Sequence, residues 1–309
     1  MRILSYLRAR PDFYAVILCL AGYGFHSIGD ATGKFLSQSY DIHFLLVAAS
    51  AIALVISSVW IYRKKKWKGF FPTKLHLHLL RGILTGVIAI VILNGFKTLP
   101  MAYCYAIIFS TPFLVMLMSY FMLGEKFGLH RFLALVIGFA GVLVLVVGKF
   151  GEFGYDILFV IGGVILISFN VIIIRKIGPV KLLPRFAFFP YLGILVANLP
   201  FLFFAEIPAT IPPVDIGLLC LYALAGFSGI LLNSHAFTKA SATIIVTPFH
   251  YTQMFWGVLF GILIFGDYPS LTTFIGTALI IGAGAYTLYR EYKLGRHNTQ
   301  KVDVLGPEV

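Results

Sequence analysis

The stretch from residue 155 to residue 174, YDILFVIGGVILISFNVIII, carries one charged side chain, Asp156, and is otherwise almost wholly apolar. A helix needs about 20 mostly apolar residues to cross the hydrocarbon core of a bilayer. Strands of a membrane β-barrel need only about 10 residues and alternate polar with apolar positions, which this stretch does not do. Because backbone groups in lipid must be hydrogen-bonded internally, the stretch predicts a transmembrane helix.

Nine other stretches of this kind are separated by short connectors that are polar or contain Gly or Pro. Together they predict an all-α membrane protein with ten transmembrane helices, at about residues 13–34, 43–62, 75–97, 100–123, 131–149, 155–174, 185–205, 214–237, 240–265 and 271–290. The composition agrees, since 60% of the 309 residues are hydrophobic and 12% are charged, whereas soluble proteins have about 25% charged residues. A soluble enzyme and a nucleic-acid-binding domain are therefore poor interpretations. No GxxxxGKS or GxxxxGKT loop occurs, which argues against a primary ATP-driven pump. The Cys residues show no metal-ligand spacing, and we expect no cofactor.

The basic residues predict the orientation of these helices. If the N-terminus is cytoplasmic, all but four of the 24 Lys and Arg residues lie in cytoplasmic segments; Lys34, Lys97 and Lys149 lie outside, and Arg81 lies within the third span. Basic residues concentrate on the cytoplasmic side of membrane proteins. We therefore expect a multi-pass protein of the cell inner (cytoplasmic) membrane with both termini cytoplasmic.

The two halves of the chain resemble each other at a spacing of about 140 residues. Leu93-Asn94 matches Leu232-Asn233, Gly124-Glu125 matches Gly266-Asp267, and Phe132 matches Phe274. Each half would hold five helices, an odd number, so the two copies would face opposite ways across the membrane. Such 5+5 inverted repeats are typical of secondary transporters. The expected organisation is a cytoplasmic segment 1–12, a first repeat 13–149, a second repeat 155–290 and a disordered cytoplasmic tail 291–309.

These features together resemble the EamA-type drug/metabolite transporter (DMT) superfamily over about residues 13–290: ten spans, Asn at the ends of the third and eighth, Pro in the fourth and ninth, and the Gly-Glu and Gly-Asp closures. Residues 29–34, GDATGK, and residues 247–253, TPFHYTQ, resemble the branch that includes S-adenosylmethionine and riboflavin uptake carriers. The resemblance implies a cavity between the halves, lined by the first, third, fourth, sixth, eighth and ninth spans. Members of this branch often carry an Arg in the second span, and this chain has none there.

Polar groups inside apolar spans are costly and therefore mark candidate site residues. Asp30 either faces the cavity and binds a cation or a proton, or pairs with Lys34, which lies four residues on and would reach the outer interface. His26, one turn deeper, is either a pH-sensitive relay or a hydrogen-bonded packing residue. Pro112 and Pro248 predict breaks in the fourth and ninth spans, where a freed carbonyl can face a ligand.

The expected substrate-binding residues come from six of the spans and include three Asn residues that could equally form interhelical hydrogen bonds. Arg81 is interpreted as a snorkelling residue at the cytoplasmic end of the third span. Tyr103 could also be an ordinary interfacial aromatic residue. The complete expected set is His26, Asp30, Asn94, Tyr103, Thr111, Asn170, Asn233, His250, Tyr251, Gln253 and Trp256.

The leading hypothesis is a secondary transporter that moves a small polar metabolite across the cytoplasmic membrane by alternating access. The branch resemblance makes S-adenosylmethionine, or a similar nucleoside-like metabolite, the best candidate, and an aromatic content of 16% suits a planar or cationic ligand. The alternative is a proton-coupled exporter of amino acids or drugs. A membrane enzyme would need a convergent catalytic set that the sequence does not offer. Expected partners are the small-molecule substrate and membrane lipids, with no nucleic acid, and the chain would act as a monomer or a homodimer.

Overall fold

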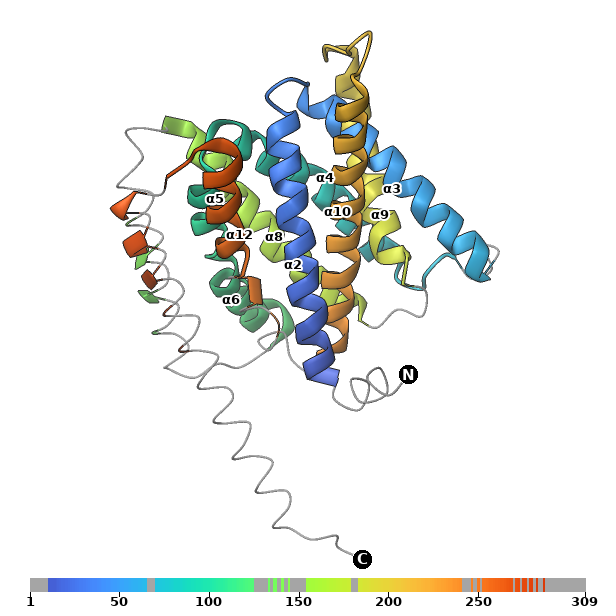
Figure 1. Cartoon of the computed structure of the whole chain (residues 1–309). Coiled ribbons are helices and arrows are strands. Elements are labelled where there is room, and N and C mark those ends of the chain that lie inside the picture. Colours follow the sequence, from blue (N-terminus) through green and yellow to red (C-terminus); the bar gives the residue numbers. More distant parts are fainter. Residues whose placement is uncertain are drawn as a thin grey trace, which may run out of the picture.

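The computed structural model describes residues 11–65, 70–124, 154–178, 183–240, 249–250, 252–268 and 270, and single residues or short runs of 133–144, 246 and 271–286. The regular elements in these parts are helices, shown in Figure 1. Their bounds are α2 Pro11–Leu36, α3 Ile42–Lys65, α4 Leu75–Thr98, α5 Met101–Ile108, α6 Thr111–Leu123, η1 Gly154–Asp156, α8 Ile157–Ile177, α9 Arg185–Asn198, η2 Leu199–Phe203, α10 Pro213–Lys239, α12 Thr252–Phe260 and η4 Gly261–Phe265.

Six of the described helical segments are long and apolar enough to cross a membrane: Ile42–Lys64, Leu75–Thr98, Tyr103–Leu123, Gly154–Ile177, Arg185–Phe203 and Pro213–Lys239. They coincide with the predicted second, third, fourth, sixth, seventh and eighth spans. α2, with 26 residues, measures about 39 Å and is also long enough to cross. The predicted fifth and tenth spans lie largely outside the described residues, so the ten-helix arrangement stays a prediction.

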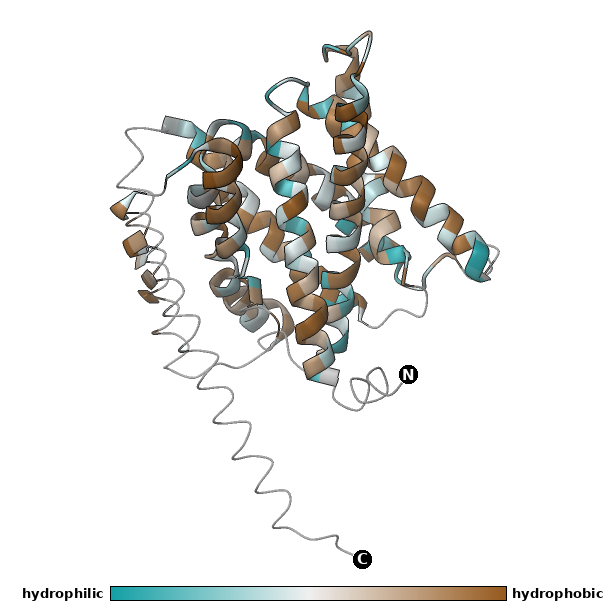
Figure 2. Ribbon diagram, in the orientation of Figure 1, coloured by the Kyte–Doolittle hydropathy of each residue, from teal (hydrophilic) through white to brown (hydrophobic). Residues whose placement is uncertain are grey.

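The outward faces of these helices carry large apolar side chains. Val55 is 63% exposed, Phe121 75%, Val214 72% and Leu263 72%. Figure 2 shows that hydrophobic residues dominate the bodies of the helices. Soluble proteins rarely expose contiguous apolar patches larger than a few hundred Å², so this surface is suited to lipid rather than to water.

The predicted break in the fourth span is present. α5 ends at Ile108 and α6 begins at Thr111, directly before Pro112, which has no backbone N–H for a continuous helical ladder. In the ninth span α12 continues into the π-helical turn η4, and Pro248 lies outside the described residues.

The most extensive contact between helices is that of α2 with α10, which stand side by side in Figure 1. A Cβ on Gly22 would lie 2.2 Å from Asn233 Oδ1, and one on Gly33 would lie 2.9 Å from the ring of Tyr222. The two helices are antiparallel, because the residue numbers run in opposite directions along the contact. They approach closely because α2 presents glycine at these positions.

Four of the described helices, α2, α4, α8 and α10, can be compared in direction. Lys34, near the end of α2, bonds the carbonyl of Leu99, which directly follows α4, so α2 and α4 finish at the same side. α8 begins at this side, because Val160 packs against Gly95 of α4, and α10 begins there too, beside Gly33. The first and third spans therefore run antiparallel to the sixth and eighth.

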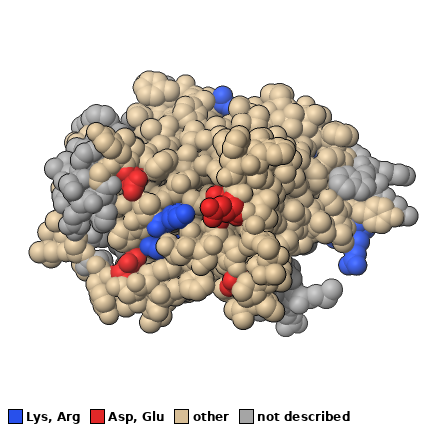
Figure 3. Space-filling model, turned by 90° about the horizontal axis from the view of Figure 1, so that it is seen from above, with Lys and Arg blue, Asp and Glu red and all other residues tan. Residues whose placement is uncertain are grey.

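The two ends of this bundle differ in charge. Lys34 and Lys97 are the described basic residues at the end where α2 and α4 finish. Figure 3 looks onto that end and shows a few charged side chains on a mostly uncharged surface. The opposite end carries a larger set of described basic residues, namely Arg63, Lys64, Lys74, Arg175, Lys176, Arg185 and Lys239.

Candidate functional site

A cavity of about 280 Å³ lies between the helices. Residues of α2, α3, α4, α5, α6, α8, α9 and α10 line it, together with His250 and Gln253 of the predicted ninth span. Small-molecule pockets usually measure about 300–1,000 Å³ and combine apolar walls with a few placed polar groups. All six spans expected to line the cavity do so, and the second and seventh contribute as well, through residues such as Ala49 and Tyr191.

Asp30 of α2 supplies the carboxylate of this cavity. Tyr105 Oη donates a hydrogen bond to Asp30 Oδ2 over 2.7 Å. Tyr105 is fully buried, and its ring lies so close to Gly257 of α12 that a Cβ there would be 2.1 Å from Tyr105 Cδ2. Residues from α2, α5 and α12 thus hold one carboxylate in a set orientation, where it can attract a cation or accept hydrogen bonds from a ligand.

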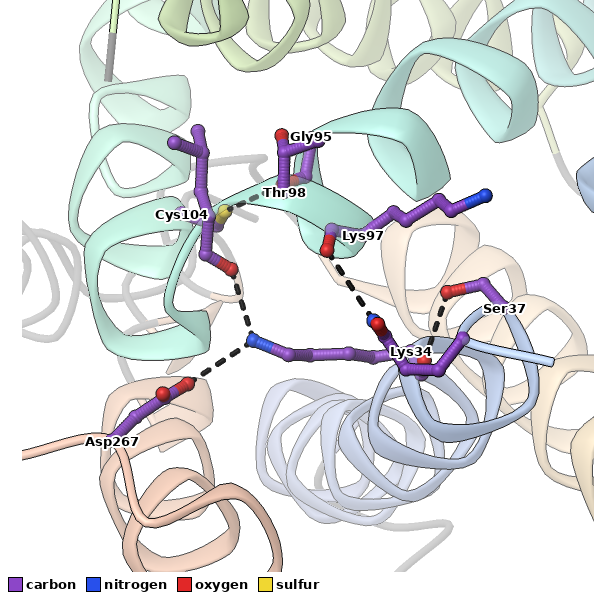
Figure 4. Close-up of polar contacts among 9 residues, drawn as sticks. Lys34, Ser37, Gly95, Lys97, Thr98, Cys104 and Asp267 are labelled. Carbon is purple, nitrogen blue, oxygen red and sulfur yellow. Dashed lines mark hydrogen bonds and ion pairs between the residues drawn. The ribbon is translucent and has the colours of Figure 1, made fainter. Parts of the chain in front are cut away.

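Lys34 pairs with Asp267 and not with Asp30. Its Nζ lies 3.1 Å from Asp267 Oδ2, the pair that Figure 4 shows with a dashed line. The same Nζ donates to the Leu99 carbonyl over 3.0 Å. The same Nζ lies 4.7 Å from the centre of the Phe265 ring. Lys34 is only 6% exposed, so the prediction that it reaches the outer interface was wrong. Its partners are the carbonyl of Leu99, directly after α4, and the carboxylate of Asp267. The amine is therefore bonded without reaching water.

Arg81 of α4 was missed as a site residue. It is 2% exposed and lines the cavity. Its Nη1 donates to the Phe186 carbonyl over 2.8 Å, its Nη2 to Ser234 Oγ over 2.6 Å, and its Nε to Asn170 Oδ1 over 3.4 Å. The snorkelling interpretation was therefore wrong, because α8, α9 and α10 enclose this guanidinium and supply its acceptors. The cost of an ionisable group within a span, which selected Asp30, applied equally to Arg81.

Three other polar residues of the expected set line the same cavity. Asn170 of α8 donates from Nδ2 to Thr85 Oγ1 of α4 over 2.9 Å, so it both bonds between helices and lines the cavity. Thr111 Oγ1, beside the break between α5 and α6, and Asn233 Oδ1 of α10 are buried without a hydrogen-bond partner among the described residues. A ligand or a water molecule would satisfy such groups.

Aromatic rings form much of the remaining wall. His250 stacks on Tyr23 with 4.6 Å between ring centroids and 11° between planes, and Phe109 meets His250 edge-on at 6.1 Å. Tyr191 and Tyr222 also line the cavity. The described tyrosines that line the cavity were not among the expected site residues, since a tyrosine within an apolar span commonly packs or lies at the interface.

The cavity brings together seven of the expected residues: His26, Asp30, Thr111, Asn170, Asn233, His250 and Gln253. Asn94 instead donates to the carbonyl of Ile90 in its own helix. Tyr103 is buried in an apolar cluster, and Trp256 packs on Phe255 and Phe260. Tyr251 lies outside the described residues. Binding of a substrate by these residues stays a prediction.

The sequence pattern of the EamA-like transporter family matches residues 13–147 and, separately, residues 155–289. An S-adenosylmethionine uptake transporter of Rickettsia prowazekii is 25% identical over 284 residues, which covers 89% of this chain and 92% of the relative. One of Rickettsia bellii is 24% identical, covering 86% and 90%. An uncharacterized transporter of Helicobacter pylori is 25% identical, covering 82% and 86%. A crystal structure of another protein matches with a TM-score of 0.65 at 17% identity, over 91% of this chain and 98% of the other; this last likeness concerns the fold alone.

Proposed function

The chain belongs to the EamA-like transporter family, is a multi-pass protein of the inner membrane, and on this basis we propose that it is a secondary carrier of S-adenosylmethionine or a similar nucleoside-like metabolite. The family and the names of the relatives indicate a transporter rather than an enzyme. The relatives named as S-adenosylmethionine uptake transporters cover most of the chain, and they suggest the cargo.

The observation that carries this proposal is the carboxylate of Asp30, the one acidic group among the described residues that line this aromatic-walled cavity. S-adenosylmethionine has a sulfonium cation, a purine ring and ribose hydroxyls. A tyrosine face such as that of Tyr222 attracts cations and can stack on a purine. Carboxylates attract cations and also commonly accept hydrogen bonds from ribose hydroxyls. The cavity therefore offers a counterpart for each of these chemical groups.

We propose that the carrier works by alternating access between two inverted repeats, residues 13–149 and 155–290. The contact of α2 with α10 has its counterpart in that of α8 with α4, and the contact of α6 with α8 has its counterpart in that of α12 with α2. Equivalent contacts of this kind, with the two halves in swapped roles, are expected if a pseudo-two-fold axis in the membrane plane relates the halves. The larger set of basic residues, at the end where α2 begins, favours the cytoplasm for that end.

Uptake of radiolabelled S-adenosylmethionine into proteoliposomes tests the proposed cargo. We expect saturable uptake above that of protein-free liposomes, and a loss of at least about tenfold in Asp30→Asn, in line with one lost charge-assisted interaction. The matched control is Glu206→Gln, which removes an exposed carboxylate outside the cavity. Wild-type protein that neither takes up nor exchanges the labelled compound would remove S-adenosylmethionine as the cargo.

The second candidate function is proton-coupled export of amino acids or drugs, and the presence of Asp30 and His26 in one cavity favours it. A pH gradient alone would then drive flux of an amino acid or a drug, and His26→Ala would uncouple this flux from the gradient. Flux that does not respond to the pH gradient would exclude this alternative.

A further inference from the structure

Arg81 faces the cavity and has no acidic partner in the part of the chain that the structure describes. The acceptors of its three hydrogen bonds are a carbonyl, a hydroxyl and a side-chain amide, all of them neutral. Among the described residues, the ion pair is that of Lys34 with Asp267, so no described carboxylate pairs with Arg81. A guanidinium has five N–H donors, and these three bonds leave two of them without an acceptor among the residues described.

A buried cation without an anion is costly, because desolvation of the charge is not repaid. A group of this kind persists in a membrane protein where it pairs with something or serves a function. The guanidinium fork matches a carboxylate in two parallel hydrogen bonds. An anionic group of a ligand in the cavity would supply the missing partner.

Arg81 and Asp30 lie at different depths of the cavity. α2 and α4 finish at the same side, and Asp30 is six residues from the end of α2 whereas Arg81 is seventeen residues from the end of α4. At 1.5 Å per residue the two Cα levels are about 16 Å apart along the helices. Ser234, the Arg81 acceptor on α10, is five residues from the last residue of that helix, Lys239. The guanidinium therefore stays close to the level of its own Cα.

We propose that Arg81, supported by Ser234 and Asn170, binds the carboxylate of the cargo, an inference that rests on the proposed function and specifies one end of the substrate. In S-adenosylmethionine only a few bonds separate the sulfonium from the carboxylate. A carboxylate on Arg81 therefore places the sulfonium among the aromatic rings, and the ribose hydroxyls and the adenine amino group reach toward Asp30. A cargo with an anionic end and a hydrogen-bond-donating end fits both groups.

The test compares S-adenosylmethionine with its decarboxylated form, which keeps the sulfonium, the amine and the adenosine. Binding is measured by calorimetry on purified carrier in lipid nanodiscs. Wild-type protein should bind the carboxylate-bearing compound about 10- to 100-fold more tightly, the ratio expected for a charge-assisted bond. Arg81→Gln should bring this ratio close to one, and Arg81→Lys should restore part of it. The matched control is Arg63→Gln, which removes an exposed cation at the end of α3 and should leave the ratio unchanged.

Equal binding of the two compounds by wild-type protein overturns the inference without touching the proposed cargo. An equal weakening of both compounds by Arg81→Gln does the same, because a merely structural role predicts that result. If neither adenosyl compound binds, the proposed cargo fails, and the pair L-phenylalanine and L-phenylalaninamide decides about Arg81. Tighter binding of the acid, lost in Arg81→Gln, supports the carboxylate site, and equal or absent binding of this pair overturns it.

Discussion

Removing the charge of Asp267 by the substitution Asp267→Asn is expected to favour conformations in which the cavity opens at the end where α2 finishes. The ion pair of Lys34 with Asp267, drawn in Figure 4, links the end of α2 to the segment that directly follows η4. α2 belongs to the first half of the chain and Asp267 to the second. If the halves separate at this end during transport, this bond breaks.

The magnitude follows from the geometry of the pair. At 3.1 Å and an effective dielectric constant of about 20, the Coulomb energy is about 5 kcal/mol. The side chains are 8% and 25% exposed, so desolvation offsets much of this energy. We expect a net contribution of about 1–2 kcal/mol, which corresponds to a 5- to 30-fold change in the ratio of closed to open carrier.

The assay is the rate at which a membrane-impermeant thiol reagent labels a cysteine in the cavity. Ala49→Cys places the reporter on α3, where Ala49 lines the cavity. Cys220, the least buried of the native cysteines, is replaced by Ser. Added from the side where α2 finishes, the reagent should react about 5- to 30-fold faster in Asp267→Asn and in Lys34→Met. Glu206→Gln, which removes an exposed carboxylate, is the matched control.

Unchanged labelling in both single variants would refute the reasoning, provided that the thermal unfolding of each matches that of the reporter protein. The charge exchange Lys34→Asp with Asp267→Lys should return the rate toward that of the unmodified pair. Faster labelling that persists in this exchange variant would show that packing, and not the ion pair, holds this end closed.

Two further predictions concern packing and pH. Gly257→Ala would place a Cβ 2.1 Å from the ring of Tyr105 and push its hydroxyl away from Asp30. We expect a loss of about 1–3 kcal/mol of stability, as for other overpacked cores, and weaker cargo binding. Gly162→Ala, whose added Cβ meets no atom within 4 Å, should lower neither quantity, because Ala is the better helix former where space is open. Comparable losses in the two variants would contradict this account. Tyr40, in the connector between α2 and α3, donates to Asp215 Oδ2 over 2.5 Å, and this bond raises the pKa of Tyr40 above its ordinary value of 10.0. Because the folded pKa is the higher one, the stabilisation is complete below pH 10 and is lost as the pH rises through the folded pKa. The melting temperature of wild type should exceed that of Tyr40→Phe by a constant amount below pH 10, and this difference should shrink above pH 10. A difference in melting temperature that stays constant to high pH would refute a stabilising hydrogen bond from the Tyr40 hydroxyl.

The membrane class, the positions of the described spans and the break before Pro112 could be predicted from the sequence. Each of these depends on a property of one continuous segment, such as its hydropathy or the missing N–H of a proline. The cost of burying a charge also selected Asp30 without any knowledge of its neighbours. Family membership was predictable for a similar reason, since short motifs and the spacing of the spans survive in the linear sequence.

The partners of the charged side chains depended on the tertiary structure. Lys34 has an acid four residues away, Asp30, yet it pairs with Asp267, and Arg81 finds its acceptors on α8, α9 and α10. Helical spacing shows which residues can meet within a helix, but it does not show which face of that helix another helix will cover. Hydropathy determined that these helices enter the membrane. Which polar side chains face one another there was decided only when segments far apart in the chain packed together.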